Sequence, residues 1–288
     1  MTSRSLTSAT AEACVLVLCA RNRPLPKLYD MRLQSTVSVS AVTITYRLLC
    51  YFSETSAVIQ TSQQKIVDEA ITSRHSMRAY LPTPVSREDI ASMLEVAARA
   101  PSGSNTQPWK AYVLMGEMKE RLTAEILAVY QDKAQFEALT EDYRYYPSDW
   151  SSPYLERRRK VGLDLYKLLG LGREDKAGMH AQHGKNYAFF GAPVGMIFTV
   201  ERKMNTGSWL DFGCFLQSLM IAARGRGLDT CAQAAFNRFH PVIRRVTGIP
   251  EQEVVMCGLA LGVADMSQIE NTLISEREPL NGFAKFLD

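Results

Sequence analysis

The segment from residue 208 to residue 222 constrains the fold more than any other part of the sequence. Ser208 is expected to cap a helix there, and Gly225 or Gly227 to end it. Apolar side chains lie nearly all round this predicted helix: Trp209, Leu210, Phe212, Cys214, Phe215, Leu216, Leu219, Met220, Ile221 and Ala222. Such a helix must be buried on most of its sides. A subunit interface would explain that burial well in a chain of 288 residues.

Other segments alternate between helical and extended patterns. Helical spacing of apolar residues predicts helices at residues 63–73, 86–98 and 117–131, and His240-Pro241 opens a further one. Apolar runs predict strands at residues 111–115, 193–200, 228–236 and 254–262. The helices and strands are mixed without a strict βαβ order, which indicates an α+β fold.

Residues 1–60 differ in composition from the rest of the chain. They hold fifteen Ser or Thr, six Lys or Arg and three Asp or Glu, without clear helical or strand periodicity. We expect a disordered extension, or a translation start upstream of the functional one. The Arg- and Ser-rich, acid-poor composition also resembles an organelle transit peptide. Residues 61–288 are expected to form one folded domain.

Charge and cysteine content narrow the class of protein. Residues 1–60 carry the whole net charge of +3, which is too small to indicate a nucleic-acid partner. The longest clean apolar runs have about eight residues, short of the ~18 that a membrane span needs. Six cysteines without a C-x-x-C pair predict reduced thiols in a cytoplasmic protein. The four histidines have no ligand partners at suitable spacing, so no metal site is expected.

Three short features carry the chemistry. Arg74-x-Ser76-x-Arg78 offers two guanidinium groups and a hydroxyl, which suit a phosphate, although such a segment alone is more simply a solvated turn. Residues 100–109, A-P-S-G-S-N-T-Q-P-W, predict a rigid polar loop. Residues 271–280 form an extended segment that carries Arg277. The sequence has no G-x-G-x-x-G, G-x-x-x-x-G-K-[ST] or G-x-S-x-G, so Rossmann dehydrogenases, kinases and hydrolases lack their usual motifs here.

Together these three features resemble the nitroreductase family of FMN-dependent oxidoreductases. The pattern is R-x-S-x-R-x-[FY], then P-S-x-x-N-x-Q-P-W, then N-x(5,6)-R-x-P-L, and the resemblance covers residues 61–288. The sequence is most similar to the branch that reduces nitrobenzoates and dinitro-substituted aromatics. The resemblance implies a mixed central sheet flanked by helices, and an intertwined homodimer with FMN at the subunit interface.

The resemblance also assigns the cofactor contacts, residue by residue. Arg74, Ser76 and Arg277 would hold the FMN phosphate, whose charge two guanidinium groups balance. His75 would contribute mainly its backbone. Arg78 would lie toward flavin N1 and the C2 carbonyl, where a cation stabilises the reduced flavin.

Two further groups of residues follow from the same match. The partner subunit would contribute four loop residues: Pro101, Ser102, Gly103 and Asn105. Gln233, Ala234 and Ala235 match the family segment whose backbone N–H groups point at flavin N5 and O4. The family contact that follows the first strand has no clear match in this chain.

The resemblance implies ping-pong hydride transfer through flavin N5. NADPH or NADH would deliver the hydride and leave, and a nitroaromatic acceptor would then be reduced to a hydroxylamine or an amine. No dedicated catalytic acid or nucleophile is expected, because the flavin carries the reaction. Residues 132–187, with several tyrosines and Trp150, would cover the site and suit a small aromatic substrate, unless they merely pack a helical hairpin. The basic run 157–160 within them is expected to be a solvated helix face.

Two alternatives remain open at this point. The same fold could serve a quinone or flavin reductase, or a reductive dehalogenase. A protein of a different class, a non-catalytic dimer, could use the arginine cluster to bind an anion or a partner.

Overall fold

A computed structural model describes residues 61–288, and the extension predicted at residues 1–60 lies outside the described residues. The strands are β1 (Trp109–Met115), β2 (Val194–Glu201), β3 (Asp229–Gln233) and β4 (Glu253–Gly262). The α-helices are α3 (Ser62–Thr72), α4 (Arg87–Ala97), α5 (Gly116–Gln131), α6 (Lys133–Ala138), α7 (Tyr154–Leu168), α8 (Lys176–Gly184), α9 (Gly207–Arg224), α10 (His240–Thr247) and α11 (Leu280–Phe283). Short 3-10 turns are η1 (Gly103–Asn105), η2 (Lys185–Gly191), η3 (Ala234–Phe239) and η4 (Ile269–Thr272). The α+β prediction is confirmed.

The four strands form one sheet in the order β1-β2-β4-β3. Every ladder in it is antiparallel. Within the described residues, parallel pairing is limited to an isolated bridge between Ser76 and Thr230, so the sheet is less mixed than expected. Beyond this bridge, Tyr80 forms a second isolated bridge, antiparallel, with Ala264. Within the described residues, the segment 76–80 therefore forms no ladder with β3.

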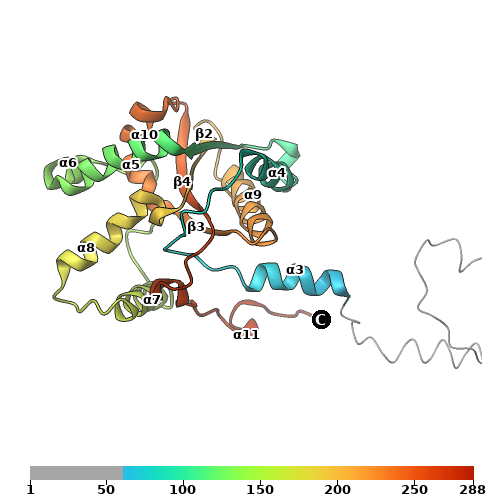
Figure 1. The fold of residues 1–288 in the computed structure, drawn as a ribbon. Coiled ribbons are helices and arrows are strands. Elements are labelled where there is room, and N and C mark those ends of the chain that lie inside the picture. The colour runs from blue at the N-terminus through green and yellow to red at the C-terminus, as the bar shows by residue number, and fades with distance from the viewer. Residues whose placement is uncertain (1–60) are drawn as a thin grey trace, which may run out of the picture. The chain divides into compact units, whose positions relative to one another are not determined.

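Apolar side chains cover both faces of the sheet. On one face, Met196 and Phe198 of β2 pack in the cluster that includes residues of α4 and α9. On the other face, Ile197 of β2 packs in the cluster that includes residues of α5 and α10. Figure 1 shows the sheet between these helix pairs. The alternation along β2 therefore places one layer of helices on each side of a buried sheet.

The apolar helix predicted at residues 208–222 is α9, and one of its faces is uncovered in the single chain. Phe212, Phe215 and Leu219 are buried, whereas Leu210 is 73% exposed. The predicted cap at Ser208 is wrong, since the helix already begins at Gly207 and Thr206 precedes it without a side-chain cap bond. A turn at residues 205–208, in which the Ser208 N–H donates to the Asn205 carbonyl (2.9 Å), places Ser208 inside the first turn of the helix and not before it. The cap predicted at Ser86 is confirmed, with its hydroxyl 2.9 Å from the Asp89 N–H.

A β-bulge interrupts β4 at Met256. Phe198 pairs with Cys257 and Thr199 with Val255, which leaves Met256 without a partner on β2. As a result Met256 and Cys257, although adjacent, both belong to the apolar cluster on the α9 side. Two positions further along, Gly258 accommodates Phe236, because a Cβ on Gly258 would lie 2.3 Å from that ring. The bulge and this close contact bring β4, α9 and η3 together at one place.

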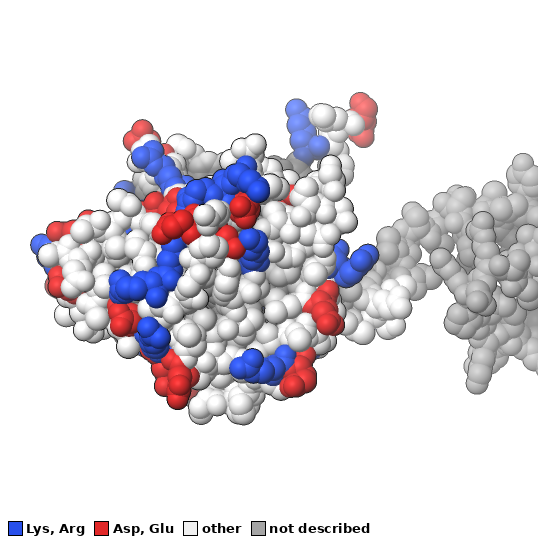
Figure 2. All heavy atoms as spheres, turned by 90° about the horizontal axis from the view of Figure 1, so that it is seen from above, with Lys and Arg blue, Asp and Glu red and all other residues white. Residues whose placement is uncertain are grey.

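Charged groups on the described surface are balanced in sign. Residues 61–288 hold 27 basic and 27 acidic residues. Figure 2 shows one face on which Lys and Arg side chains lie beside Asp and Glu side chains, without a patch of one sign. No helix within residues 61–288 combines the length and the apolar composition required to cross a membrane.

Glu253, at the start of β4, is a buried carboxylate with three side-chain donors. It is 3% exposed and accepts hydrogen bonds from Lys110 Nζ (2.7 Å), from the Tyr112 hydroxyl (2.9 Å) and from Thr199. Burial opposes its ionisation, but the bonds from Lys110, Thr199 and Tyr112 outweigh that effect and hold the pKa of Glu253 below its usual range. The ionised carboxylate therefore ties β1, β2 and β4 together.

We expect Glu253→Ala to lower the free energy of unfolding by about 3 kcal/mol, because it leaves three donors around a buried gap. Lys133→Ala is the control, since Lys133 forms only an exposed pair with Glu137 (3.8 Å). That change should cost less than about 0.5 kcal/mol. Denaturant unfolding of both variants measures the difference, and equal midpoints would contradict the role given to Glu253.

Candidate functional site

Two segments that are far apart in the sequence meet at one cavity. The loop that follows α3 supplies Arg74, His75, Ser76 and Arg78, and the extended segment before α11 supplies Arg277. The cavity has a volume of about 520 Å³. The structure thus brings together at one cavity Arg74, Ser76 and Arg277, which the resemblance assigned to the phosphate, with His75 and with Arg78, which it assigned to the flavin ring.

The electrostatics of this cavity favour an anion. Neither Arg74 nor Arg277 forms an ion pair with a carboxylate within residues 61–288, and the buried Nε of Arg74 has no hydrogen-bond partner. Burial and then the nearby Arg277 lower the pKa of Arg74. Burial, followed by Arg224 and Arg74, likewise lowers the pKa of His75. Two guanidinium groups that repel each other in a partly buried site leave a place for a doubly charged phosphate.

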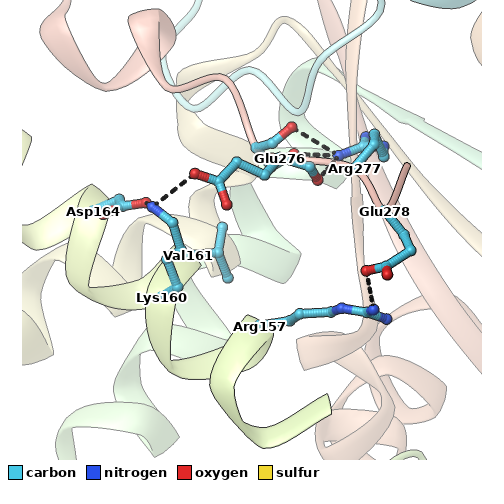
Figure 3. A pocket seen from close by; sticks show the side chains of 8 residues that line it. Arg157, Lys160, Val161, Asp164, Glu276, Arg277 and Glu278 are labelled. Atoms are coloured by element: carbon cyan, nitrogen blue, oxygen red, sulfur yellow. Dashed lines mark hydrogen bonds and ion pairs between the residues drawn. The ribbon is translucent and has the colours of Figure 1, made fainter. Parts of the chain in front are cut away.

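The segment that carries Arg277 is attached to α7. Figure 3 shows ion pairs on both sides of Arg277, from Glu278 to Arg157 and from Glu276 to Lys160 (3.2 Å). The Arg277 guanidinium donates to the Ser275 hydroxyl (2.7 Å). The basic run at residues 157–160 is exposed on α7, as expected from its charge. Arg157 and Lys160 also pair with acidic residues over a hundred positions later in the chain.

Strand β3 leads from this cavity to the second part of the site. Ser76 bridges to Thr230 near the start of β3, and Gln233 ends the strand. Three residues of extended chain span about 10 Å. Ala234 and Ala235 then begin the 3-10 turn η3, whose first N–H groups have no partner within the turn. Backbone N–H groups without a partner inside η3 thus lie roughly 10 Å from the bridge between Ser76 and Thr230.

Two cavities with aromatic walls border this end of β3. One, of about 340 Å³, is lined by α9, the β4 bulge and residues 143–145. The other, of about 460 Å³, is lined by residues of 136–146, 183–187 and 232–238. Gln233 and Ala234 line both. The aromatic side chains around them are Phe136, Tyr143, Tyr145, Tyr146, Tyr187, Trp209 and Phe212.

The segment at residues 132–187 meets the site only in part. Its tyrosines 143, 145 and 146 line the aromatic cavities, in agreement with a covering role. Trp150 does not line them and lies beside Arg158, whose guanidinium carbon is 4.9 Å from the ring centroid. Arg238 lines the larger cavity and was not identified from the sequence, because no motif marks it.

The loop at residues 101–105 does not reach these cavities within one chain. Its four predicted contact residues are half-buried or exposed, and they line none of the three cavities: Pro101, Ser102, Gly103 and Asn105. The loop is held beside α9 by the bond from the Gly103 N–H to Asp211 (3.2 Å). Ser104 and Asn105 adopt left-handed φ values of 50° and 58°. The loop is therefore a tight turn on the surface beside α9.

No group of three His, Cys, Asp or Glu side chains within residues 61–288 is arranged to hold a metal ion.

Comparisons with known proteins agree with this geometry. The family model described as "Nitroreductase family" matches residues 71–263. A 4-nitrobenzoate reductase of Pseudomonas putida is 40% identical over 220 residues, which is 76% of this chain and 95% of that protein. A nitrobenzene nitroreductase of Ectopseudomonas oleovorans is 38% identical over 221 residues, 77% of this chain and 96% of that protein.

A solved structure extends the similarity to three dimensions. The FMN and NADPH-dependent nitroreductase NfnB from sphigopyxis sp. strain HMH has a TM-score of 0.74 at 34% identity. The match covers 77% of this chain and 99% of that one. Sequence, fold and the arginine cavity agree, and the chain belongs to the nitroreductase family.

Proposed function

We propose that this protein is an FMN-dependent enzyme that reduces nitroaromatic compounds with NADPH or NADH, and that residues 61–288 form its FMN-binding domain. The observation that carries the proposal is the arrangement along β3. An arginine cavity without carboxylates lies at one end of the strand, and aromatic cavities with free backbone donors lie at the other. Relatives at about 40% identity are nitroaromatic reductases, which supports the same activity here.

The residues of the site fit FMN. Arg74, Ser76 and Arg277 would hold the phosphate, and His75 flanks them. The Nε of Arg74, which lines the cavity, has no partner within the described residues, and a ligand can supply the missing bond. Bound FMN would supply hydride transfer from NAD(P)H to the nitro group.

The chain's own groups then stabilise charge and exclude water. Arg78 is oriented by its bond to the Ser76 carbonyl (3.0 Å), which leaves its remaining donors for the flavin pyrimidine ring. The side-chain amide of Gln233 donates to the Asn186 carbonyl (2.6 Å) and is therefore already engaged. The backbone N–H groups of Ala234 and Ala235 would then be the donors to flavin N5 and O4. The tyrosine-lined cavities would take nicotinamide and acceptor in turn.

We further propose a homodimer whose partner loop completes each site. Apolar side chains stand exposed on α3, on α9 and along the C-terminal segment: Ile66, Val67, Ile71, Leu210, Phe283, Phe286 and Leu287. Phe283, Phe286 and Leu287 are 71%, 81% and 82% exposed, an unusual cost for a lone chain in water. A second copy would cover these faces and bring its residues 101–105 to the flavin.

The cysteines are consistent with a cytoplasmic protein, which we also propose. Cys214, Cys231 and Cys257 are free, and burial raises the pKa of Cys231 and of Cys257, the latter to about 12. Thiols of this kind are structural rather than reactive.

The visible spectrum of the purified full-length protein tests the proposed function. We expect a flavin absorbance band that bleaches with NADPH or NADH and returns when a nitroaromatic is added. Parallel turnover with quinones and halophenols separates the alternative reductases on this fold. A protein without a flavin band that also fails to bind FMN on titration would instead support a non-catalytic anion-binding role.

Arginine substitutions test the phosphate site. Arg277→Ala and Arg74→Ala should each weaken FMN binding by about 1.5–3 kcal/mol, because each removes one charge-assisted contact. Arg173→Ala is the matched control, since Arg173 is exposed and lies outside the cavity. Fluorescence titration of apoprotein with FMN measures the change. Equal affinity in the parent and Arg277→Ala would contradict the phosphate assignment.

A charge on the uncovered face of α9 tests the dimer. Leu210→Glu should shift the protein toward the monomer in light scattering and lower its FMN content, because the partner loop is lost. Met118→Glu adds the same charge at a half-exposed apolar position of α5 and should leave both unchanged. A monomeric parent that retains FMN would refute the shared site.

A further inference from the structure

We propose that Asn237 is a positioning residue that fixes Tyr143 as the rigid wall of the acceptor cavity. This inference rests on the proposed function, since it concerns how the nitroaromatic acceptor is held. Asn237 lies in η3, shortly after Ala234 and Ala235, and it is 1% exposed. It neither lines a cavity beside β3 nor belongs to the residues matched to FMN.

The Asn237 side chain bonds only to the backbone of residues 142 and 143. Its Oδ1 accepts from the Asp142 N–H (2.7 Å) and the Tyr143 N–H (3.3 Å). Its Nδ2 donates to the Tyr143 carbonyl (2.7 Å). A buried amide that satisfies three backbone groups of one loop fixes both the place and the direction of that loop.

The neighbouring carboxylate anchors the loop to the sheet. Asp142 pairs with Arg202 (2.7 Å) and Arg244 (2.8 Å) and accepts from the Val255 N–H (2.9 Å). Burial opposes ionisation of Asp142, but the bonds from Arg244, Val255 and Arg202 outweigh it and hold its pKa below the usual range. The loop is thus attached to β4 on one side and to η3 on the other.

The β4 bulge receives the Tyr143 side chain. The hydroxyl donates to the Met256 carbonyl (2.7 Å), in the residue that the bulge leaves without a partner on β2. The ring meets Trp209 edge-on, with centroids 4.8 Å apart. Burial raises the pKa of Tyr143, so the phenol keeps its proton and remains a donor.

The two exposed tyrosines of the aromatic wall, Tyr145 and Tyr146, are held less firmly than Tyr143. Tyr145 and Tyr146 are 50% and 47% exposed, and their ring contacts are with each other and with Tyr143 and Trp150. The cavity lined by Tyr143 therefore has one wall fixed by hydrogen bonds at the backbone and the hydroxyl, and beside it Tyr145, which is held by ring contacts alone. A fixed wall preorganises the cavity for a flat aromatic ring and lowers the cost of binding it.

Binding of 4-nitrobenzoate to the oxidised FMN-loaded protein tests the proposal without turnover. The change in flavin absorbance on binding measures the Kd of 4-nitrobenzoate. We expect Asn237→Ala to raise this Kd by about fivefold or more, and to raise the KM for 4-nitrobenzoate by a similar factor. Tyr143→Phe keeps the ring and should raise the Kd by about threefold. FMN content, and reoxidation by ferricyanide, which needs no aromatic cavity, should stay within about twofold of the parent.

Tyr112→Phe is the matched control. It also removes one phenol hydroxyl that donates to a buried acceptor, Glu253, but Tyr112 does not line either aromatic cavity. Its Kd for 4-nitrobenzoate should equal that of the parent. If Asn237→Ala fails to fold, the Kd values of Tyr143→Phe and Tyr112→Phe are compared instead. Equal Kd values in these two variants would overturn the proposal.

The outcomes separate this inference from the proposed function. Parent-like Kd and KM in Asn237→Ala and Tyr143→Phe overturn the positioning role while the reductase function stands. A parent that binds no 4-nitrobenzoate also overturns it. A parent that binds 4-nitrobenzoate without reducing any nitroaromatic refutes the proposed function, and the Kd values then decide the positioning role alone.

Discussion

The burial of β4 holds the rest of the site in place. All ten of its residues are buried, and it pairs with β2 on one side and β3 on the other. Glu253 at its start binds β1 and β2, the bulge at Met256 receives Tyr143, and Gly258 accommodates the ring that seats η3. A strand without exposed positions cannot shift its register without moving its apolar set. The distance between the arginine cavity and the aromatic cavities is therefore set by a rigid element.

Buried charge is paired in one part of this protein and left unpaired in another. Asp142 and Glu253 are buried with full sets of donors, so their ionised forms stabilise the fold. Arg74 and Arg277 are brought together without carboxylates, which is unfavourable for the protein alone. The first arrangement stabilises the fold, and the second is the kind of unpaired charge that functional sites contain. This contrast, more than cavity size, supports the proposal that the phosphate binds between Arg74 and Arg277.

The sequence predicted most of the fold correctly, and it predicted the arginine cavity through a motif. Helices at residues 63–73, 86–98 and 117–131 appear within a few residues, because their apolar spacing and the Ser86 cap act locally. The exposure of residues 157–160 was predicted, but the ion pairs of Arg157 and Lys160 were missed, since their partners Glu278 and Glu276 are remote in sequence. Asn237 was missed for the same reason: nothing near it shows that its amide is buried against residues 142 and 143.

By itself, the sequence determined the α+β class, the order of the elements and the chemistry of the arginine loop, because periodicity, capping and residue type depend on neighbours a few positions apart. Only the tertiary structure decided the antiparallel pairing, the bulge at Met256 and the meeting of Arg74 with Arg277. It also decided that residues 101–105 lie beside α9 and do not line the cavities of their own chain. These features depend on contacts between distant segments, whose free energy is realised only when the whole core is buried.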